Sequence, residues 1–337
     1  MKLKEIQIEK NEITNWKDYR KRPAREDDFK DLITEPCRLM SGENLVGIYL
    51  VIPKSKETEL LREVVKRVDF MRNKRTGGLT THSKVFGYLP REIIRKDYCS
   101  SSAMSVEKPS HHAVICNFAE TLSKHYKETC PEMFDWHDKL IKDKIKKEWI
   151  IKGTPYTSGV INKNTQLNYH WDRGNFPKIY SNMVAFKKDC VGGHLAMPEY
   201  NVGLEVADLS ICLFAGQKVL HGVTPFQIEK QGGYRYTLVY YSMQQMWKCE
   251  DVTTEIARIR TRKTTREKNR LLRQQGKLKL EDDPIKELRV MIGDPKKYMN
   301  YNLFAELGID RKYLGVPFTR LPIDIQKKLV DYKQEKR

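Results

Sequence analysis

Five residues in the middle of the chain have the types and spacing to hold a metal ion with an organic acid beside it. His170 and Asp172 form a His-x-Asp pair, and His221 supplies a second imidazole. Two imidazoles and one carboxylate bind Fe(II) in non-haem iron oxygenases and leave positions open for a 2-oxo acid and O2. Arg235 offers a planar fork for a second carboxylate, and Thr237 adds a hydroxyl on the same face of a strand. These residues predict an iron site that binds 2-oxoglutarate.

The same residues also have ordinary structural interpretations. His170 and Asp172 fit a hydrogen-bonded pair in a turn, and His221 fits a core histidine. Arg235 fits a salt-bridged residue on a strand. These interpretations together amount to one alternative, in which the chain has no iron site.

Short strands must position these residues. After residue 150, β-like runs alternate with turns rich in Gly, Asn and Pro, and no helical pattern separates them, which favours a sandwich or a barrel. The runs are 156–161, 166–170, 181–187, 210–214 and 234–243.

The first half of the chain has a different pattern. Residues 1–44 are mostly polar and predict an arm, and the apolar run 45–52 predicts a buried strand. Residues 73–100 combine Gly, Pro and many cations, and we interpret them as a functional loop system. Apolar residues at helical spacing predict amphipathic helices over 57–71, 111–126 and 131–149. The fold class is therefore α+β, with helices first and a β-domain packed against them.

The composition points to a polyanionic partner. Lys and Arg number 62 and Asp and Glu 44, which gives a net charge of +18, and such a charge is most often matched to nucleic acid. No apolar run is long enough for a membrane helix or a signal peptide, so we expect an intracellular protein without a membrane span. The seven cysteines include no Cys-x-x-Cys pair. This argues against a disulfide framework and a cysteine zinc site, and predicts reduced thiols.

Half of the net charge lies in one stretch. Residues 258–280 hold ten Lys or Arg residues and one Glu, a net charge of +9, and have too few apolar positions for a core helix. One interpretation is a solvated, partly helical surface element. The other is a basic helix that contacts nucleic-acid phosphates through residues such as Arg260, Arg262, Lys263 and Arg266.

The order of the motifs resembles that of the double-stranded β-helix 2-oxoglutarate oxygenases, and most closely the TET/JBP family. The motifs are His170-Trp171-Asp172, Gly192-Gly193-His194-Leu195 with Pro198-Glu199, then His221, then Arg235-Tyr236-Thr237. The resemblance covers about 155–245. It is looser over 45–150, where Phe86-Gly87-Tyr88 and Pro90-Arg91 resemble the family's lead-in, and it does not reach the tail. The absence of the cysteine-rich segment of animal TET proteins suggests a compact microbial or phage-like form.

The resemblance implies a fold, an activity and cofactors. The expected fold is a double-stranded β-helix (jelly-roll) core with N-terminal helices packed on it and a basic C-terminal extension. The expected domains are an arm (1–44), the dioxygenase (45–250, with its helical lead-in over 45–150 and β-core over 151–250) and the extension (251–337). The implied enzyme is a dioxygenase that uses Fe(II), 2-oxoglutarate and O2, with ascorbate supporting its activity. It oxidises the 5-methyl group of a pyrimidine in DNA, first of all 5-methylcytosine to 5-hydroxymethylcytosine.

Three more residues acquire roles from the resemblance. Asn175 would read the edge of the base, Tyr241 would stack on a flipped base, and His194 would be a second contact to the cofactor. The alternatives are a turn residue for Asn175, a core residue for Tyr241 and a surface residue for His194. Met243 departs from the pattern, because TET enzymes that act on 5-methylcytosine place a base-reading histidine there. The identity of the base therefore stays open.

The expected partner is double-stranded DNA with a methylated pyrimidine, bound by a monomer. The expected location is the cytoplasm of a bacterium or phage-infected cell, or the nucleus of a eukaryote. Three other functions remain as alternatives: a thymine hydroxylase of JBP type, a hydroxylase of RNA or protein, and a non-catalytic nucleic-acid-binding protein on an oxygenase scaffold.

Overall fold

The computed structural model describes residues 3–11, 13, 18–19, 22–74, 80–91, 98–277, 307–310, 313 and 321–335. The chain divides into two units, Met1–Ile259 and Arg260–Arg337, which are described separately.

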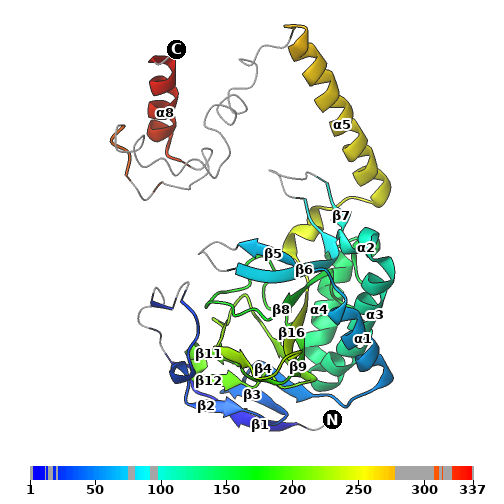
Figure 1. Ribbon diagram of the computed structural model, residues 1–337, viewed down its shortest axis with the longest axis vertical. Helices are drawn as coiled ribbons and strands as arrows, with labels where there is room; N and C mark the ends of the chain where they lie inside the picture. The colour runs from blue at the N-terminus through cyan, green and yellow to red at the C-terminus, as the bar shows by residue number, and fades with distance from the viewer. Residues whose placement is uncertain are drawn as a thin grey trace. The chain divides into compact units, whose positions relative to one another are not determined.

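The first unit is built on a large mixed sheet (Figure 1). Most neighbouring strands in it are antiparallel, but β1 pairs with β3 in parallel. In spatial order the strands are β1 (Lys4–Gln7), β3 (Cys37–Ser41), β4 (Asn44–Val51), β13 (Ser210–Phe214), β9 (Ser181–Lys188), β16 (Tyr234–Tyr241), β8 (Ser158–Lys163), β6 (Thr80–Leu89) and β5 (Met71–Lys74), with β7 (Ser100–Ser101) paired to β6.

Two smaller sheets complete the β-structure of this unit. The first has the order β14 (Gly222–Val223), β11 (Leu195–Met197), β12 (Val202–Leu204) and β2 (Asp31–Ile33). The second pairs β10 (Cys190–Gly192) with β15 (Phe226–Ile228).

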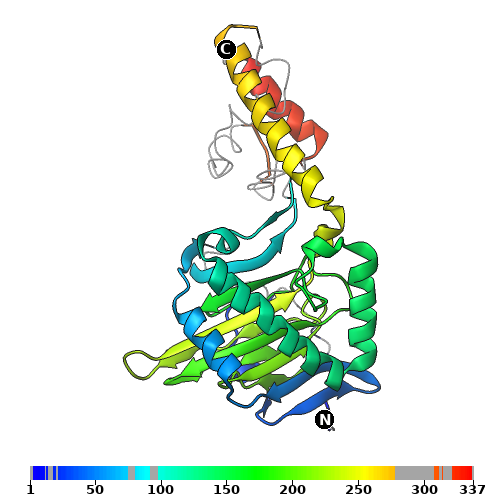
Figure 2. The ribbon, with the colours of Figure 1, turned by 90° about the vertical axis from the view of Figure 1, so that its right-hand side faces the viewer.

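Helices cover one face of the large sheet, and Figure 2 shows α1 and α3 lying across its strands. The helices are α1 (Lys56–Lys66), α2 (Met104–Glu107), α3 (Pro109–Thr129) and α4 (Pro131–Lys144). Leu61 of α1 and Phe118 of α3 belong to the same buried cluster as Ile211 and Leu213 of β13. The alternate residues of β13 point to the other face, because side chains alternate along a strand. There they pack with residues of β11 and β12, so the unit is layered as helices, large sheet and small sheet.

Local sequence signals set where these helices begin. Ser55 caps α1 by accepting a hydrogen bond from the Thr58 N–H at 3.2 Å, and the Thr58 hydroxyl accepts in return from the Ser55 N–H. Pro109 and Pro131 stand at the first positions of α3 and α4, where a missing N–H costs nothing.

The second unit has a small apolar cluster of its own. Ile309, Leu321, Ile325 and Leu329 are buried together, and the last two lie on α8 (Ile323–Glu335). Helix α5 (Val252–Gln274) begins in the first unit and carries the start of the basic stretch. Among the described residues, no helix is long and apolar enough to cross a membrane.

The α+β class agrees with the expectation, but several boundaries differ. The helix predicted over 57–71 ends at Lys66. The prediction was too long because Val68 is apolar and buried, but it reaches the core from the connection to β5. The helix predicted over 131–149 ends at Lys144, after which Ile145 is extended. The predicted strand 166–170 forms only isolated bridges. Within the predicted loop system 73–100, β6 is a ten-residue strand of the large sheet.

The expected N-terminal arm contributes to both main sheets. Strands β1 and β3 extend the large sheet, and β2 pairs in parallel with β12 of the small sheet. Strand β3 forms a hairpin with β4, but β1 and β2 lie next to partners that are distant in sequence. Because β1 and β2 are also largely exposed, their apolar pattern is weak.

One pair of cysteines is also linked, contrary to the expectation of reduced thiols. Cys99 and Cys249 form a disulfide with a Cα–Cα distance of 5.7 Å. The two residues are 150 positions apart, so their spacing in the sequence carries no signal. The other five cysteines are free.

Candidate metal and cofactor site

A cavity of about 290 Å³ lies where the large sheet meets the small one. Its wall includes residues of β6, β8, β9 and β16 from the large sheet, and Leu195 and Val223 from the small sheet. All five residues from which the sequence predicts an iron site, His170, Asp172, His221, Arg235 and Thr237, line this one cavity.

The alternation of β16 sorts its residues between the core and the cavity. Tyr234, Tyr236, Leu238 and Tyr240 belong to the core beneath the helices. Arg235, Thr237, Val239 and Tyr241 line the cavity. Since side chains alternate along a strand, one eight-residue segment both packs the core and builds the site.

His170, Asp172 and His221 form a cluster whose ligand atoms all lie within 4.8 Å of one another. The Nε2 atoms of His170 and His221 are 3.5 and 3.8 Å from Oδ1 of Asp172. The two histidines also exchange backbone hydrogen bonds of 2.9 and 3.1 Å, so the loop before Asp172 and the segment before β14 are paired at this point. The arrangement fits one metal ion held by two imidazoles and one carboxylate.

Backbone carbonyls fix which nitrogen of each imidazole is free. The carbonyl oxygens of Asn168 and Val219 lie 2.7 and 2.9 Å from Nδ1 of His170 and His221. A carbonyl oxygen only accepts hydrogen bonds, so each Nδ1 carries the proton and donates it. Each Nε2 therefore keeps a lone pair directed to the cluster, as a metal ligand requires.

The surroundings of the cluster favour a neutral histidine and a fixed carboxylate. Burial and the neighbouring His170 lower the pKa of His221 to about 4, so its imidazole is neutral near pH 7. The backbone N–H of Asp172 donates to the carbonyl of Gly216 at 2.9 Å. A Cβ atom at residue 216 would lie 2.3 Å from Oδ2 of Asp172, so only glycine leaves room for the carboxylate.

Arg235 places a buried positive charge in the cavity wall. Its side chain is 2% exposed, and its NH2 group donates to the carbonyl of Gly193 at 2.9 Å. Its Nε atom is buried and has no hydrogen-bond partner among the described residues. Burial lowers the pKa of Arg235 to about 10, and the guanidinium is still charged at pH 7. An unpaired buried donor on a cation fits an incoming carboxylate.

A glycine pair makes room for this arginine. Gly193 has φ +74°, and a Cβ at this position would lie 2.7 Å from Nε of Arg235. A side chain at residue 193 would therefore both strain the backbone and displace the guanidinium. The neighbouring Gly192 also has a positive φ.

The residues expected to contact a base lie at the other end of β16. Asn175 and Tyr241 both line the cavity, together with Met243. The side-chain amide of Asn175 donates to the hydroxyl of Ser181 at 3.1 Å, and Asn175 forms a backbone bridge with Met243. These three side chains are half-buried, so each is in part open to solvent.

Other predicted residues are not in the cavity. His194 is half-buried beside Thr224, whose hydroxyl accepts from its backbone N–H at 2.9 Å, and it does not line the cavity. Arg260 is exposed on α5. The side chains of Arg262, Lys263 and Arg266 lie outside the described residues.

The sequence did not single out Asn162. It lies on β8 opposite Thr237 and lines the cavity, it is 3% exposed, and its Oδ1 has no hydrogen-bond partner among the described residues. The signal was a polar residue at an inward position of a strand, two residues after Val160, but the predicted strand ended at residue 161.

Comparison with known families matches most of the residues that line this cavity to an oxygenase domain. The profile of the Tet_JBP family, described as the oxygenase domain of the 2OGFeDO superfamily, matches residues 92–244. This range contains the metal cluster, Arg235 and Tyr241.

Curated relatives include thymine dioxygenase JBP1 of Trypanosoma brucei brucei and the same protein of its strain 927/4 GUTat10.1. Each is 22% identical over 165 residues, which cover 48% of this chain. The match spans only 19% of the length of these relatives.

Solved structures that match part of this chain include NgTET1 in complex with 5mC DNA, with a TM-score of 0.49 and 14% identity over 70% of this chain and 89% of that chain. Another is a 2OG-Fe(II) oxygenase family protein from Burkholderia pseudomallei, with a TM-score of 0.36 and 10% identity over 58% of this chain and 85% of that chain. The assignment rests on the family profile, the curated relatives and the metal cluster. The chain thus contains a dioxygenase that resembles the TET/JBP family and uses Fe(II), 2-oxoglutarate and O2, with residues 92–244 as the matched part.

Proposed function

We propose that this protein hydroxylates the 5-methyl group of a pyrimidine in DNA. The observation that carries the proposal is a single cavity that combines a His-Asp-His cluster, a buried arginine with an unpaired donor, and a half-buried Asn and Tyr at the opposite end. In the reaction, 2-oxoglutarate, O2 and the methylated base give succinate, CO2 and the hydroxymethyl base. We also propose that the two main sheets form a double-stranded β-helix.

The residues of the cavity divide into three groups, which would hold the metal, the cofactor and the substrate. His170, Asp172 and His221 would hold Fe(II), which supplies the oxidising power for C–H hydroxylation when 2-oxoglutarate and O2 are bound. Arg235 and Thr237 would bind the far carboxylate of 2-oxoglutarate, with two hydrogen bonds from the guanidinium fork. We keep His194 as a proposed second contact to the cofactor, although it does not line the cavity.

The substrate end must receive a base that is outside the helical stack. A methyl group inside a duplex does not reach a buried metal, so the base must be flipped out. Stacking on Tyr241 and hydrogen bonds to Asn175 would offset the cost of flipping.

The first candidate base is 5-methylcytosine, which the resemblance to TET enzymes implies. Thymine is the second candidate, and two observations favour it. The side chain of Met243 has no donor or acceptor strong enough to read a cytosine edge, and the curated relatives are named thymine dioxygenases.

We further propose that the basic stretch 258–280 binds DNA phosphates. The motivating observation is its net charge of +9. Deletion of residues 260–337 should weaken DNA binding and flatten its dependence on salt. The deletion starts after Ile259 because the first unit ends there. Unchanged binding at every salt concentration would refute this role.

The broader assignments follow from a DNA substrate. We propose that the protein acts as a monomer, in the cytoplasm of a bacterium or phage-infected cell or in a eukaryotic nucleus. We also propose that the oxygenase domain is followed by a basic extension, near the start of α5.

Mass spectrometry of nucleosides tests the proposal. The full chain is incubated with Fe(II), 2-oxoglutarate, ascorbate and duplex DNA that contains 5-methylcytosine and thymine. 5-Hydroxymethylcytosine or 5-hydroxymethyluracil is the expected product and identifies the base. The variant with His170→Ala and Asp172→Ala should form neither, whereas His111→Ala, on α3 outside the cavity, should match the wild type.

Two results would contradict the proposal. Succinate formation without a DNA product would point to RNA or protein as the substrate. DNA binding without succinate formation would identify a non-catalytic binding protein.

A further inference from the structure

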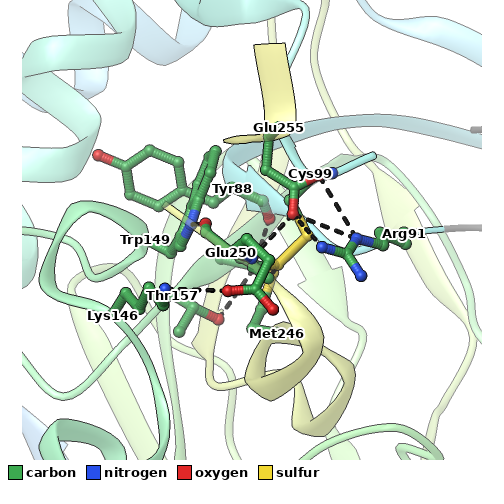
Figure 3. The surroundings of a disulfide bond; sticks show 11 residues. Tyr88, Arg91, Cys99, Lys146, Trp149, Thr157, Met246, Glu250 and Glu255 are labelled. Atoms are coloured by element: carbon green, nitrogen blue, oxygen red, sulfur yellow. Dashed lines mark hydrogen bonds and ion pairs between the residues drawn. A yellow bond between two sulfur atoms is a disulfide. The ribbon is translucent and has the colours of Figure 1, made fainter. Parts of the chain in front are cut away.

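The disulfide lies in a buried cluster next to the cavity. Cys99 and Cys249 are 2% and 4% exposed, and they belong to a buried cluster with Met246, Trp149 and Phe176. Figure 3 shows Trp149 and Met246 beside the disulfide. Met243 packs against the same cluster and also lines the cavity. The disulfide is therefore separated from the substrate end of the cavity by one short segment of chain.

A buried carboxylate holds both sides of this disulfide. Glu255 is 1% exposed, and its carboxylate accepts hydrogen bonds from the backbone N–H groups of Cys99 and Glu250 at 2.9 and 2.8 Å. It also forms an ion pair with Arg91 (Figure 3). Burial alone would raise the pKa of Glu255, but these bonds lower it below its usual range, so the carboxylate is charged.

Further bonds anchor the segment from the opposite side. The backbone carbonyl of Glu250 accepts from Nε1 of Trp149 at 2.7 Å, and its carboxylate accepts from Nζ of Lys146 at 3.0 Å. Arg91, Cys99 and Lys146 lie far before Glu250 in the sequence. The end of the oxygenase domain is thus tied to its helical half.

Hydrogen bonds connect the disulfide to the cavity wall. The N–H of Cys249 donates to the carbonyl of Met246 at 3.0 Å, and the N–H of Met246 donates to that of Met243 at 3.1 Å. Gln244, which follows Met243 in the chain, donates its N–H to the carbonyl of Gly174 at 2.7 Å. Since Asn175 bridges Met243, any shift of this turn moves the residues that face the substrate.

We propose that the Cys99–Cys249 disulfide and Glu255 form a redox-sensitive clamp that positions the substrate end of the cavity. This inference rests on the proposed function, because it assigns DNA to that end. We call these residues positioning residues, since they act through Met243 and Asn175. When the clamp is closed, the DNA-binding end is held in place. When it is open, DNA binds more weakly.

The cofactor end should not respond to the clamp. Arg235 lies near the start of β16, and five residues of a paired strand separate it from Tyr241. Its anchor is Gly193, on a different segment. The clamp should therefore change the affinity for DNA and leave the affinity for 2-oxoglutarate nearly unchanged.

Opening the clamp is a balanced exchange with a dithiol. The disulfide takes up two electrons and two protons and becomes two thiols. Dithiothreitol supplies these electrons and protons and becomes a cyclic disulfide. Closing the clamp requires a disulfide oxidant, such as oxidised glutathione. A reducing compartment would open it, and an oxidising one would close it.

Peptide mapping tests whether the link exists. Non-reduced, denatured protein is alkylated and digested, and the peptides that contain Cys99 and Cys249 should be recovered as one cross-linked species. Dithiothreitol should release them. Alkylation of all seven cysteines in protein treated with oxidised glutathione would overturn the proposal.

Binding and kinetics test what the link does. The double variant Cys99→Ser and Cys249→Ser should bind duplex DNA about fivefold more weakly or worse, an effect of the size that couples distinct sites. Its KM for 2-oxoglutarate should stay within about twofold. Dithiothreitol should weaken DNA binding by the wild type to the same extent, with no added effect on the double variant. Glu255→Gln tests the clamp with the disulfide intact and should shift DNA affinity in the same direction.

Cys130→Ser is the matched control, because Cys130 is a buried free cysteine outside the disulfide cluster. Unchanged DNA affinity in the double variant, or an equal loss of affinity for DNA and 2-oxoglutarate, would overturn the clamp. Affinity for DNA is measured by fluorescence anisotropy and needs no turnover. Absence of succinate formation by the wild type would therefore overturn the proposed function, while the clamp is judged separately.

Discussion

Replacing Arg235 with methionine should stabilise the protein when 2-oxoglutarate is absent and destroy its response to 2-oxoglutarate. Arg235 is buried, and its Nε has no hydrogen-bond partner among the described residues. A buried arginine with an unpaired donor lowers the free energy of unfolding of the protein until a ligand binds to it. Methionine has a similar length and no charge, so it removes both the cost and the binding group.

The size of the effect follows from the buried charge. Burial lowers the pKa of Arg235 to about 10, so the folded state disfavours the charged form. This penalty to stability is fully present at pH 7 and fades only as the pH rises above the lowered pKa of about 10. A tenfold change in proton affinity is worth about 1.4 kcal/mol, which makes the penalty about 3 kcal/mol. Loss of the bond to the Gly193 carbonyl costs about 1 kcal/mol. The net gain is about 2 kcal/mol, or roughly 3 °C in Tm for a chain of 337 residues.

Thermal and urea unfolding at pH 7 measure this gain, with and without 2-oxoglutarate and with Mn(II) in place of Fe(II). At a concentration 100-fold above Kd, the cofactor should stabilise the wild type by about 2.7 kcal/mol, and the variant much less. The order of stability should therefore reverse when 2-oxoglutarate is added. Arg258→Met is the control, because this arginine is exposed on α5. An Arg235→Met variant that is less stable than the wild type and still stabilised by 2-oxoglutarate would refute the reasoning.

Three further predictions concern other residues. Gly216→Ala should lower the affinity for Fe(II) by about tenfold or more, because the new Cβ would lie 2.3 Å from Oδ2 of Asp172; metal titration measures it, and unchanged affinity would show that the carboxylate is free to move. Burial lowers the pKa of His137 to about 3, so the unfolded state takes up a proton as the pH falls below about 6.5 and the folded state does not. Between pH 7 and pH 5 the wild type should lose about 2 kcal/mol more stability than His137→Gln in urea unfolding, and equal slopes would contradict this. Met243→His should raise the ratio of oxidised 5-methylcytosine to oxidised thymine in competition assays, and an unchanged ratio would remove Met243 from base selection.

The site could be predicted further than the fold around it. The order of His170, Asp172, His221 and Arg235 along the chain was enough to predict an iron and 2-oxoglutarate site, because few types of residue bind iron and a dicarboxylic acid. Their gathering in one cavity depends on the pairing of distant strands, which the sequence does not specify. The β-like run 234–243 located β16, and the structure shows that its side chains alternate between the core and the cavity.

Other elements left no usable signal in the sequence. Strands β1 and β2 are short and largely exposed, so their residues are polar like those of an arm. The sequence of β6 resembles that of a loop because it contains Gly and several polar residues, although its residues His82 to Gly87 pair with β8 in an unbroken ladder. The disulfide joins segments whose proximity is a product of the whole fold.

The strand β16 also has a consequence for how such a protein changes over generations. Arg235 and Tyr241 stand six residues apart on it, a span of about 20 Å at the usual rise of a strand. Under the proposed function, demands on the oxidising reaction fall on one end of β16, and demands on the choice of base fall on the other. A lineage can therefore exchange residues near Tyr241 and Met243 to acquire a new base while the inherited reaction continues unaltered.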